Sequence, residues 1–424
     1  MISDFRPAPR PKSLQAAIDD LSEQRQTPDQ NTPFQTPEQV ASTPSIEVPV
    51  TPNDDGVIAN GQKTPLVHHI KKLALHWPPS RKQAIIGGVI ALVVIASGVG
   101  GWVSFHHNAK PVVAPKVTVI KKAAIVVPTT VPSLLSGLPV EPAVNSRPIT
   151  GVMIENSLDA RPQSGLAQAS VVFEAIAEGG ITRFLALFQD TQPDNVGPVR
   201  SSRPYYLQWA LGFDATYGHV GGSPEALDAI KSWGVKDMDQ FYNGSSYHRI
   251  STRYAPHNVY TSLATLSQLE ASKGYGASTF KGWLRKADTP LATPTAKTID
   301  LAISGPTYNA HYDYDVASHT YKRSEGGSAH LDADSQVQIS PKVVIALVMA
   351  YQLQSDGYHS DYTTLGSGQA YVFQDGAVTI GSWNKADNAS PLSFLDSAGK
   401  PLALNAGQTW LSAVRAASNV TFNP

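Results

Sequence analysis

Residues 171–189 read VVFEAIAEGGITRFLALFQ and set the pattern for the folded part of the chain. The apolar runs 171–177 and 181–189 flank the tripeptide Glu178-Gly179-Gly180, and glycines between apolar runs are typical of tight turns. The upstream run 149–155 has the same apolar character. We therefore predict three strands here, the second and third joined by a tight turn.

Helix signals follow these strands. A short helix is predicted at 204–211, and Ser223-Pro224-Glu225 opens another. Serine at the N-cap accepts a hydrogen bond from an otherwise unpaired N–H, and proline at the first helical position has no N–H to satisfy. The other elements expected in this region are a strand at 215–220 and a helix at 261–274. The alternation predicts an α/β sandwich domain over residues 134–275.

The pattern changes after a linker at 276–296. Short runs of β-forming residues, separated by Asp-Gly, Gly-Ser-Gly and Ala-Gly turns, predict a mostly β domain over 297–424. The runs are 298–303, 310–314, 320–323, 343–352, 369–373, 377–383 and 409–414. The overall class expected is α+β, an α/β sandwich domain followed by a mostly β C-terminal domain.

A membrane anchor is predicted at residues 84–105, which read AIIGGVIALVVIASGVGGWVSF without a charge. As a helix this stretch spans roughly 33 Å, enough for a hydrocarbon core of about 30 Å. More basic residues precede it than follow it: Lys71, Lys72, Arg81 and Lys82 against Lys110 and Lys116. The positive-inside rule then predicts a signal-anchor helix in the cell membrane, single-pass type II, with the globular part extracytoplasmic.

The segments on either side of this helix are poor in apolar clusters or rich in proline. Residues 1–83 are expected to form a disordered cytoplasmic tail, and 106–133 an extended Pro-rich spacer. The tail contains six Thr-Pro pairs. Two interpretations stay open for them: a solvated, proline-stiffened tail, or kinase sites at which phosphothreonine adds charge.

Composition excludes several functions. The chain has 33 basic and 34 acidic residues and no long Lys/Arg run, so we expect no nucleic-acid partner. Without cysteine there is no disulfide, thiol nucleophile, Cys-based zinc site or lipid-modified cysteine. P-loop, nucleophile-elbow and paired-histidine zinc motifs are missing too, so we predict no cofactor and no metal.

Ten motifs in order resemble the YerB-like lipoproteins, a family labelled domain of unknown function 3048. Those in the first module are IEN at 154–156, ARPQSGLAQA at 160–169, EGGITRFLALF at 178–188, GPVRSSRPYY at 197–206, HVGGSPEAL at 219–227 and APHNVY at 255–260. Those in the second are YDYD at 312–315, YKR at 321–323, SGQAYVFQDGAVTIGSW at 367–383 and LNAGQTW at 404–410. The resemblance covers nearly all of 134–424. It implies an extracytoplasmic, membrane-tethered, two-domain bacterial protein, and no reaction; the chain departs from it in lacking a lipidated cysteine.

Arginines and histidines gather in the first predicted domain, near two helix starts. Helix N-termini present unpaired N–H groups, and arginine binds phosphate or carboxylate in a bidentate manner, so we predict an anion-binding pocket. Its expected residues are Arg183, Arg200, Ser202, Arg203, His219, Gly222, Ser223, Arg253, His257, Asn258, Glu155 and Glu178. In the alternative interpretation the arginines pair with carboxylates, namely Glu155, Glu174, Glu178 and Asp214.

The favoured function is binding or scaffolding at the cell envelope, with an envelope polymer or an envelope protein as partner. A hydrolase or transferase with His219 or His257 as general base is an alternative, with no catalytic residue assigned. A transmembrane sensor that uses the Thr-Pro-rich tail is another. In the β domain, Tyr371, Trp383 and Trp410 are expected either to pack in the core or to stack on sugars.

Overall fold

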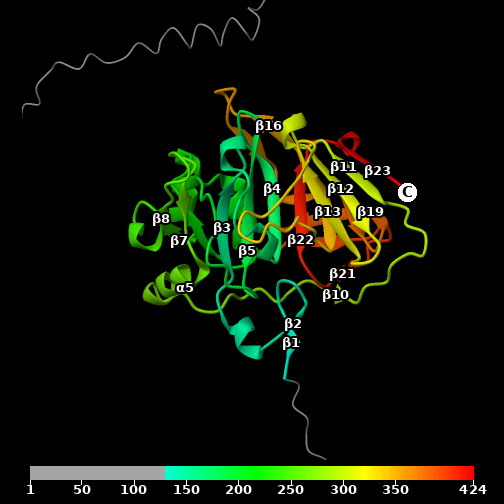
Figure 1. Cartoon of the computed structure of the whole chain (residues 1–424), viewed down its shortest axis with the longest axis horizontal. Helices are drawn as coiled ribbons and strands as arrows, with labels where there is room; N and C mark the ends of the chain where they lie inside the picture. The colour runs from blue at the N-terminus through cyan, green and yellow to red at the C-terminus, as the bar shows by residue number, and fades with distance from the viewer. Residues whose placement is uncertain (1–128) are drawn as a thin grey trace, which may run out of the picture. The chain divides into compact units, whose positions relative to one another are not determined.

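The computed structural model describes residues 129–424 (Figure 1). The predicted tail, the helix at 84–105 and most of the spacer lie outside the described residues. Within 129–424, none of the helices has both the length and the apolar character needed to cross a membrane.

The stretch 171–189 forms a hairpin, as predicted. Strand β4 (Val171–Glu178) pairs antiparallel with β5 (Ile181–Phe188), which pairs on its other side with β3 (Thr150–Glu155). Gly179 and Gly180 form the turn with φ of 56° and 79°, a left-handed conformation that glycine adopts without a Cβ penalty. Nearly every residue of these strands is buried, which accounts for their continuous apolar character.

A ten-stranded sheet draws strands from both ends of the described chain. Strand β22 lies between β15 and β4 and is parallel to both, so residues 409–414 pair with residues 343–348 and 171–174. In spatial order its strands are β20 (Ser393–Leu395), β19 (Ala377–Lys385), β18 (Gly366–Gln374), β15 (Val343–Val348), β22 (Thr409–Val414), β4, β5, β3, β6 (Thr216–His219) and β7 (Lys236–Asp239). A sheet-rich fold with few helices is confirmed. The predicted sandwich is not confirmed, and the proposed domain limits stay a prediction.

A second sheet of five strands comes from the C-terminal segment. Its order is β14 (Ser328–Ala329), β13 (Thr320–Glu325), β12 (Ala310–Asp315), β11 (Thr298–Leu301) and β23 (Val420–Asn423). The two-stranded pairs are β1 (Val131–Pro132) with β2 (Pro139–Val140), β8 (His248–Arg249) with β9 (Val259–Tyr260), β10 (Arg285–Lys286) with β21 (Leu404–Asn405), and β16 (Tyr351–Leu353) with β17 (Ser360–Tyr362).

Three α-helices lie in the described part. They are α3 (Pro204–Leu211), α4 (Pro224–Ser232) and α5 (Leu263–Ser272). The 3-10 turns are η1 (Pro142–Ser146), η2 (Leu158–Ala160), η3 (Leu166–Gln168), η4 (Gly244–Ser246), η5 (Pro306–Tyr308) and η6 (Ala417–Asn419). Serine caps α4 and α5 by accepting a backbone N–H, Ser223 from Ala226 and Ser262 from Thr265. The predicted start of α4 is thus confirmed.

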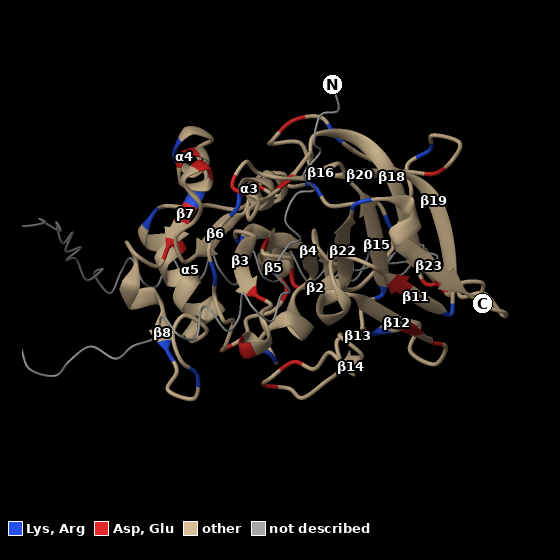
Figure 2. Ribbon diagram, turned by 90° about the horizontal axis from the view of Figure 1, so that it is seen from above, with Lys and Arg blue, Asp and Glu red and all other residues tan. Residues whose placement is uncertain are grey.

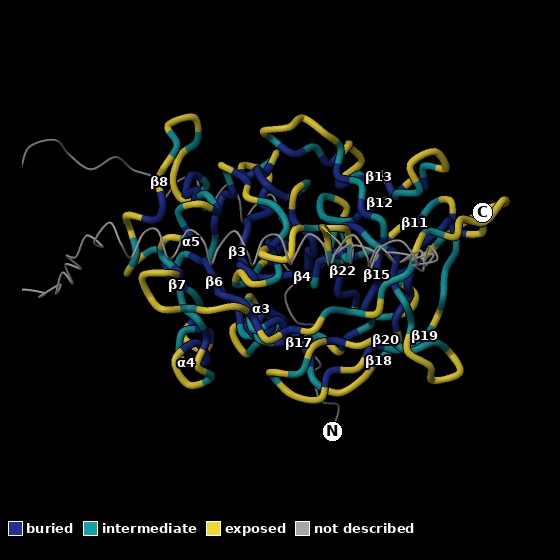
Figure 3. The backbone as a smooth tube through the Cα atoms, turned by 90° about the horizontal axis from the view of Figure 1, so that it is seen from below, coloured by how far each residue is buried: buried dark blue, intermediate teal, exposed yellow. Residues whose placement is uncertain are grey.

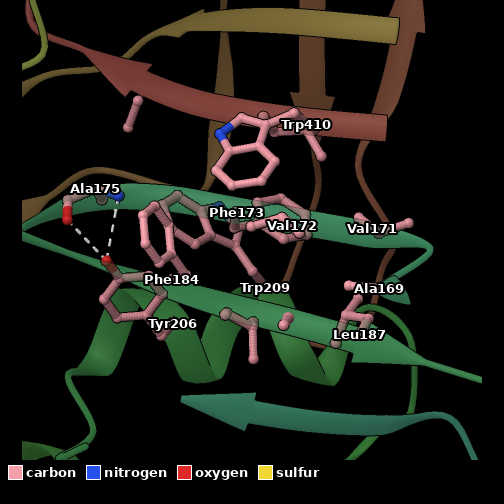
Figure 4. Close-up of a cluster of buried hydrophobic side chains, with 14 of the residues drawn as sticks. Ala169, Val171, Val172, Phe173, Ala175, Phe184, Leu187, Tyr206, Trp209 and Trp410 are labelled. Carbon is pink, nitrogen blue, oxygen red and sulfur yellow. Dashed lines mark hydrogen bonds between the residues drawn. The ribbon is translucent and has the colours of Figure 1, made fainter. Parts of the chain in front are cut away.

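Aromatic side chains fill the core on both faces of β4 and β5 (Figure 4). Phe173 stacks on Trp209 of α3 with ring centroids 5.0 Å apart, and Phe184 meets the edge of Trp410 of β22 at 5.3 Å. Trp383 and Tyr371 are buried as well. Of the two expectations for Tyr371, Trp383 and Trp410, packing in the core is therefore the one that the structure confirms. Along the strands the backbone is mainly buried, and the exposed stretches are concentrated in the loops (Figure 3).

Candidate functional site

Two buried arginines share one carboxylate where the β4–β5 hairpin meets the start of α3. Glu178, the last residue of β4, forms an ion pair with Arg183 of β5 through one oxygen and with Arg203 through the other. Arg183 Nη1 also donates to Ser201 O at 3.0 Å, and Arg203 Nη1 to Ser202 O at 2.6 Å. Burial lowers the pKa of Arg203. Within residues 129–424 the Nε atoms of both arginines lack a hydrogen-bond partner.

A second carboxylate adjoins this group. Glu155 lies opposite Arg183 in the β3–β5 register, and its Oε1 lies 3.3 Å from Arg200 Nε. We call Arg183, Arg200, Arg203, Glu155 and Glu178 the arginine cluster. Three guanidinium groups face two carboxylates, so the cluster has one net positive charge. Arg200 is its most accessible arginine, with 26% of its side chain exposed.

His257 joins the cluster through Glu155. Its Nδ1 lies 3.0 Å from Glu155 Oε1 and 3.2 Å from Ser157 Oγ, so the carboxylate and the serine contact the same ring nitrogen. In a catalytic triad the base contacts the nucleophile through one nitrogen and the carboxylate through the other. This arrangement therefore lacks the triad geometry.

His219 lies elsewhere in the fold and is fully buried at the end of β6. Its Nδ1 lies 2.8 Å from Gly221 O, and its Nε2 lies 2.8 Å from Asp237 Oδ1. Since both ring nitrogens are occupied, neither is available to take a proton from a substrate. This histidine orders the turn that leads to α4.

The remaining predicted residues have local roles in the described structure. Ser202 Oγ lies 3.0 Å from Tyr217 Oη, and Gly222 pairs with Ser202 in an isolated bridge. Ser223 caps α4. A hollow of about 420 Å³ beside Gly221 and Gly222 is lined by two carboxylates, Asp237 and Asp239, and by one ammonium group, Lys231, so its lining has one more negative than positive group and does not favour an anion.

The β8–β9 hairpin brings Arg253 against the loop that follows β3, and Asn258 forms hydrogen bonds within the hairpin. Arg253 donates to Asp159 O at 3.0 Å and to Pro162 O at 2.6 Å. Asn258 Nδ2 donates to Arg253 O at 3.2 Å, while Asn258 Oδ1 accepts from Arg249 at 2.6 Å. The two bonds of Arg253 attach the hairpin to the loop that also carries Ser157.

A buried charge network that the sequence did not suggest links the two sheets. Arg323 of β13 is fully buried; its Nη2 lies 3.0 Å from Glu174 Oε1 of β4 and 3.4 Å from Glu325 Oε1. Tyr321, Arg323 and Glu325 occupy every second position of β13 and therefore face the same side of the strand. This spacing of two residues is the sequence pattern that could have predicted a shared buried face. The other expected carboxylate, Asp214, pairs with Lys236.

Surface charge gives no further site. Acidic and basic positions are interspersed over the described ribbon (Figure 2). No set of three or more His, Asp or Glu side chains in residues 129–424 is arranged to hold a metal ion. The site that the structure assembles is therefore the arginine cluster with His257.

Comparisons with known proteins show similarity to one family. Residues 135–276 match the family described as "Protein of unknown function (DUF3048) N-terminal domain", and residues 299–411 match its C-terminal domain. A protein from Bacillus subtilis (strain 168) named "Putative lipoprotein YerB" is 32% identical over 291 residues, which is 66% of this chain and 85% of that protein. The crystal structure of the YerB protein from Bacillus subtilis superposes with a TM-score of 0.63 at 29% identity, covering 69% of this chain and 99% of that one.

Proposed function

Because the chain belongs to the DUF3048 family of proteins of unknown function, we propose that it is a membrane-tethered envelope protein that binds an anionic group outside the cytoplasm. The printed name of the 32% identical relative, "Putative lipoprotein YerB", supports the envelope location. This chain has no cysteine to carry a lipid, so the apolar stretch 84–105 is proposed as its anchor.

The observation that carries the binding proposal is the excess positive charge of the arginine cluster. Glu178 pairs with two arginines at once, and Glu155 pairs with Arg200. The cluster therefore contains one more arginine than carboxylates. An unbalanced charge at a partly buried site attracts an anion more strongly than one in water, because the local dielectric is low. A phosphate or carboxylate group that contacts Arg200 would neutralise the cluster.

Binding is favoured over turnover by the positions of the two histidines. His219 has partners on both nitrogens, and His257 directs Nδ1 alone toward both Glu155 and Ser157. We therefore propose a phosphate-bearing or carboxylate-bearing envelope polymer as ligand. A protein partner is the outcome to pursue if the polymer test fails.

The test uses residues 129–424, which lie in one compact unit. Binding to purified phosphate-bearing wall polymer is measured at low and physiological salt for the unmodified protein, Arg200→Gln, and the matched control Lys400→Gln. Lys400 is exposed and lies outside the cluster, so both variants lose one positive charge. We expect Arg200→Gln to weaken binding about tenfold and Lys400→Gln to leave it unchanged. Equal weakening by both variants, or none by either, contradicts a specific anion site.

A further inference from the structure

Three side chains with complementary chemistry meet where the segment 276–296 contacts the C-terminal part of the chain. Strand β10 pairs parallel with β21, so Lys286 lies directly opposite Asn405 (Figure 1). Asp375, in the turn between β18 and β19, contacts both of these side chains. The amine of lysine is a nucleophile, the amide of asparagine has an electrophilic carbon, and aspartate can accept and donate protons. We call Lys286, Asp375 and Asn405 the lysine triad.

Hydrogen bonds fix the orientation of the Asn405 amide. Its Nδ2 donates to Asp375 Oδ1 at 2.6 Å, and its Oδ1 accepts from Lys286 Nζ. Lys286 Nζ also donates to Asp375 Oδ2. One carboxylate therefore contacts both the amine and the amide nitrogen. Because a C=O bond is about 1.2 Å long, the Asn405 carbonyl carbon lies within about 4 Å of Lys286 Nζ.

The lysine triad is held in place and largely shielded from water. Asn405 is fully buried, and only 7% of the Asp375 side chain and 29% of the Lys286 side chain are exposed. Thr289 donates to Asp375 through its backbone N–H at 3.0 Å and through its hydroxyl at 3.1 Å. Asn405 N donates to Gln374 Oε1 at 2.8 Å. Groups that folding holds in contact react faster than free groups, because little entropy remains to be lost on the way to the transition state.

We propose that Lys286 and Asn405 react with each other to form an intramolecular isopeptide bond, with Asp375 as the proton carrier. In the product, Lys286 Nζ is joined to Asn405 Cγ and one ammonia has been lost. The bond fastens β10 covalently to β21 across 119 positions of the sequence. The lysine triad shares no residue with the arginine cluster, so this modification is independent of the anion contact proposed above.

The reaction begins with proton transfer inside the lysine triad. Burial raises the pKa of Asp375, but hydrogen bonds from Lys286 and Asn405 lower it below its ordinary value, so Asp375 starts as a carboxylate. Its Oδ2 takes a proton from the Lys286 ammonium, which leaves a neutral amine with a free electron pair. That pair attacks Asn405 Cγ, the Nζ–Cγ bond forms, and the π electrons of the C=O bond move onto Oδ1.

Collapse of this tetrahedral intermediate expels the amide nitrogen. The carboxyl group of Asp375, which contacts both nitrogens, passes its proton to Asn405 Nδ2. The Cγ–Nδ2 bond then breaks as the C=O bond re-forms, and ammonia leaves. Lys286 Nζ gives up its extra proton through Asp375 to the departing ammonia. One ammonium and one primary amide thus become one secondary amide and one ammonium ion, with Asp375 unchanged and no oxidant or cofactor required.

Intact-mass spectrometry of residues 129–424, after overnight incubation at neutral pH, tests the proposal. We expect the unmodified protein to be lighter than its sequence mass by one ammonia, about 17 Da. Tandem mass spectrometry of a tryptic digest should then find a branched peptide that contains both Lys286 and Asn405, because trypsin does not cleave after an acylated lysine.

Two variants and a matched control identify the reacting groups. Lys286→Arg keeps the positive charge but lacks the amine, and Asp375→Asn cannot take up the proton, so both should keep their full sequence mass. Lys281→Arg, at an exposed lysine of the segment 276–296, should lose ammonia as the unmodified protein does. A cyclic imide at Asn405 would cause the same mass loss without Lys286, so Lys286→Arg distinguishes the two reactions. Circular dichroism checks that each variant folds.

The outcomes separate clearly. Loss of one ammonia with a branched peptide that joins Lys286 to Asn405 supports the bond. Full sequence mass of the unmodified protein, or the same loss in a folded Lys286→Arg protein, overturns it. A bond that still forms in a folded Asp375→Asn protein overturns the role of Asp375 as proton carrier. If a variant does not fold, the mass and the branched peptide of the unmodified protein decide alone.

Discussion

Replacing Arg323 by Met should strongly destabilise the protein, because Arg323 compensates a charge that is buried between the two sheets. Its guanidinium lies 3.0 Å from Glu174, and both side chains are fully buried. It also donates to Tyr312 Oη at 2.8 Å and to His330 Nδ1, and its Cζ lies 4.6 Å from the ring centroid of Trp410. Met keeps most of the apolar contact with the rings but leaves the carboxylate of Glu174 uncompensated.

The size of the effect follows from these contacts. Removing one partner of a buried ion pair costs about 3–5 kcal/mol, since the remaining charge stays buried. Glu174 Oε2 would still accept from Trp410 Nε1 at 3.1 Å and from Ser412 Oγ at 3.2 Å, which prevents a larger loss. We therefore expect the free energy of unfolding of Arg323→Met to fall by about 3–5 kcal/mol. In the double variant Arg323→Met/Glu174→Gln no charge of the pair remains, so about 2 kcal/mol should be regained relative to the sum of the single changes.

Urea denaturation of residues 129–424 at pH 7 measures the free energy of unfolding of the four proteins in this cycle. The slope of the free energy of unfolding against urea concentration should be the same for all four proteins. A constant slope shows that the four unfolding transitions expose similar surface, so their free energies can be compared. A loss below about 1 kcal/mol in Arg323→Met, or a double variant that equals the sum of the two single variants, would refute the charge-compensation argument.

Three further changes test titration and packing at other positions of residues 129–424. Burial raises the pKa of Glu325 to about 7 from 4.5, so the folded protein holds this proton more tightly than the unfolded chain. The free energy of unfolding should therefore fall by up to roughly 3 kcal/mol as pH rises from about 4.5 to about 7. Urea titrations at several pH values should show that Glu325→Gln lacks this fall. If the variant shows the same pH dependence as the unmodified protein, other groups cause the fall. Gly381→Ala places a Cβ against Leu395 O, so we expect a loss of about 1–3 kcal/mol in thermal unfolding, whereas an unaltered midpoint would show that β20 moves aside freely. Tyr206→Phe removes a hydroxyl that accepts from Ala175 N at 3.2 Å and lies within donating distance of Ala175 O, at 2.8 Å (Figure 4), and of Arg183 O, at 2.7 Å. This change should cost about 1–2 kcal/mol by the same assay, and no change would mean that water replaces the hydroxyl.

Local sequence was enough to predict the elements around the hairpin. The predicted helix 204–211 has the same limits as α3, and the predicted turn after Ala177 lies at Gly179 and Gly180. These features depend on contacts within a few residues: apolar runs, a serine cap and glycines that adopt positive φ. The run 343–352 was predicted as one strand, but the structure divides it into β15 and β16, which belong to different sheets.

For the candidate site, the alternative interpretation of the sequence named Glu155 and Glu178 as partners of arginines, but not which arginine pairs with which carboxylate. Arginine and carboxylate were expected near each other, and the structure pairs Arg183 and Arg203 with Glu178 and Arg200 with Glu155. His219 was expected beside them, but β6 directs it to Asp237. Strand pairing decides this contact, because β6 pairs parallel with β7, the strand that carries Asp237.

By itself the sequence determined the local strands, the capped helices, the family and the absence of cysteine chemistry. Tertiary structure alone decided that residues 409–414 lie between β15 and β4, and hence that one sheet contains strands from both family modules. The same long-range pairing brings Arg323 of β13 to Glu174 of β4, which the sequence places 149 residues away. The physical reason is that the backbone N–H and C=O groups of a strand can pair with those of any other strand. A local side-chain pattern therefore specifies that a segment is a strand, but not which strand lies beside it.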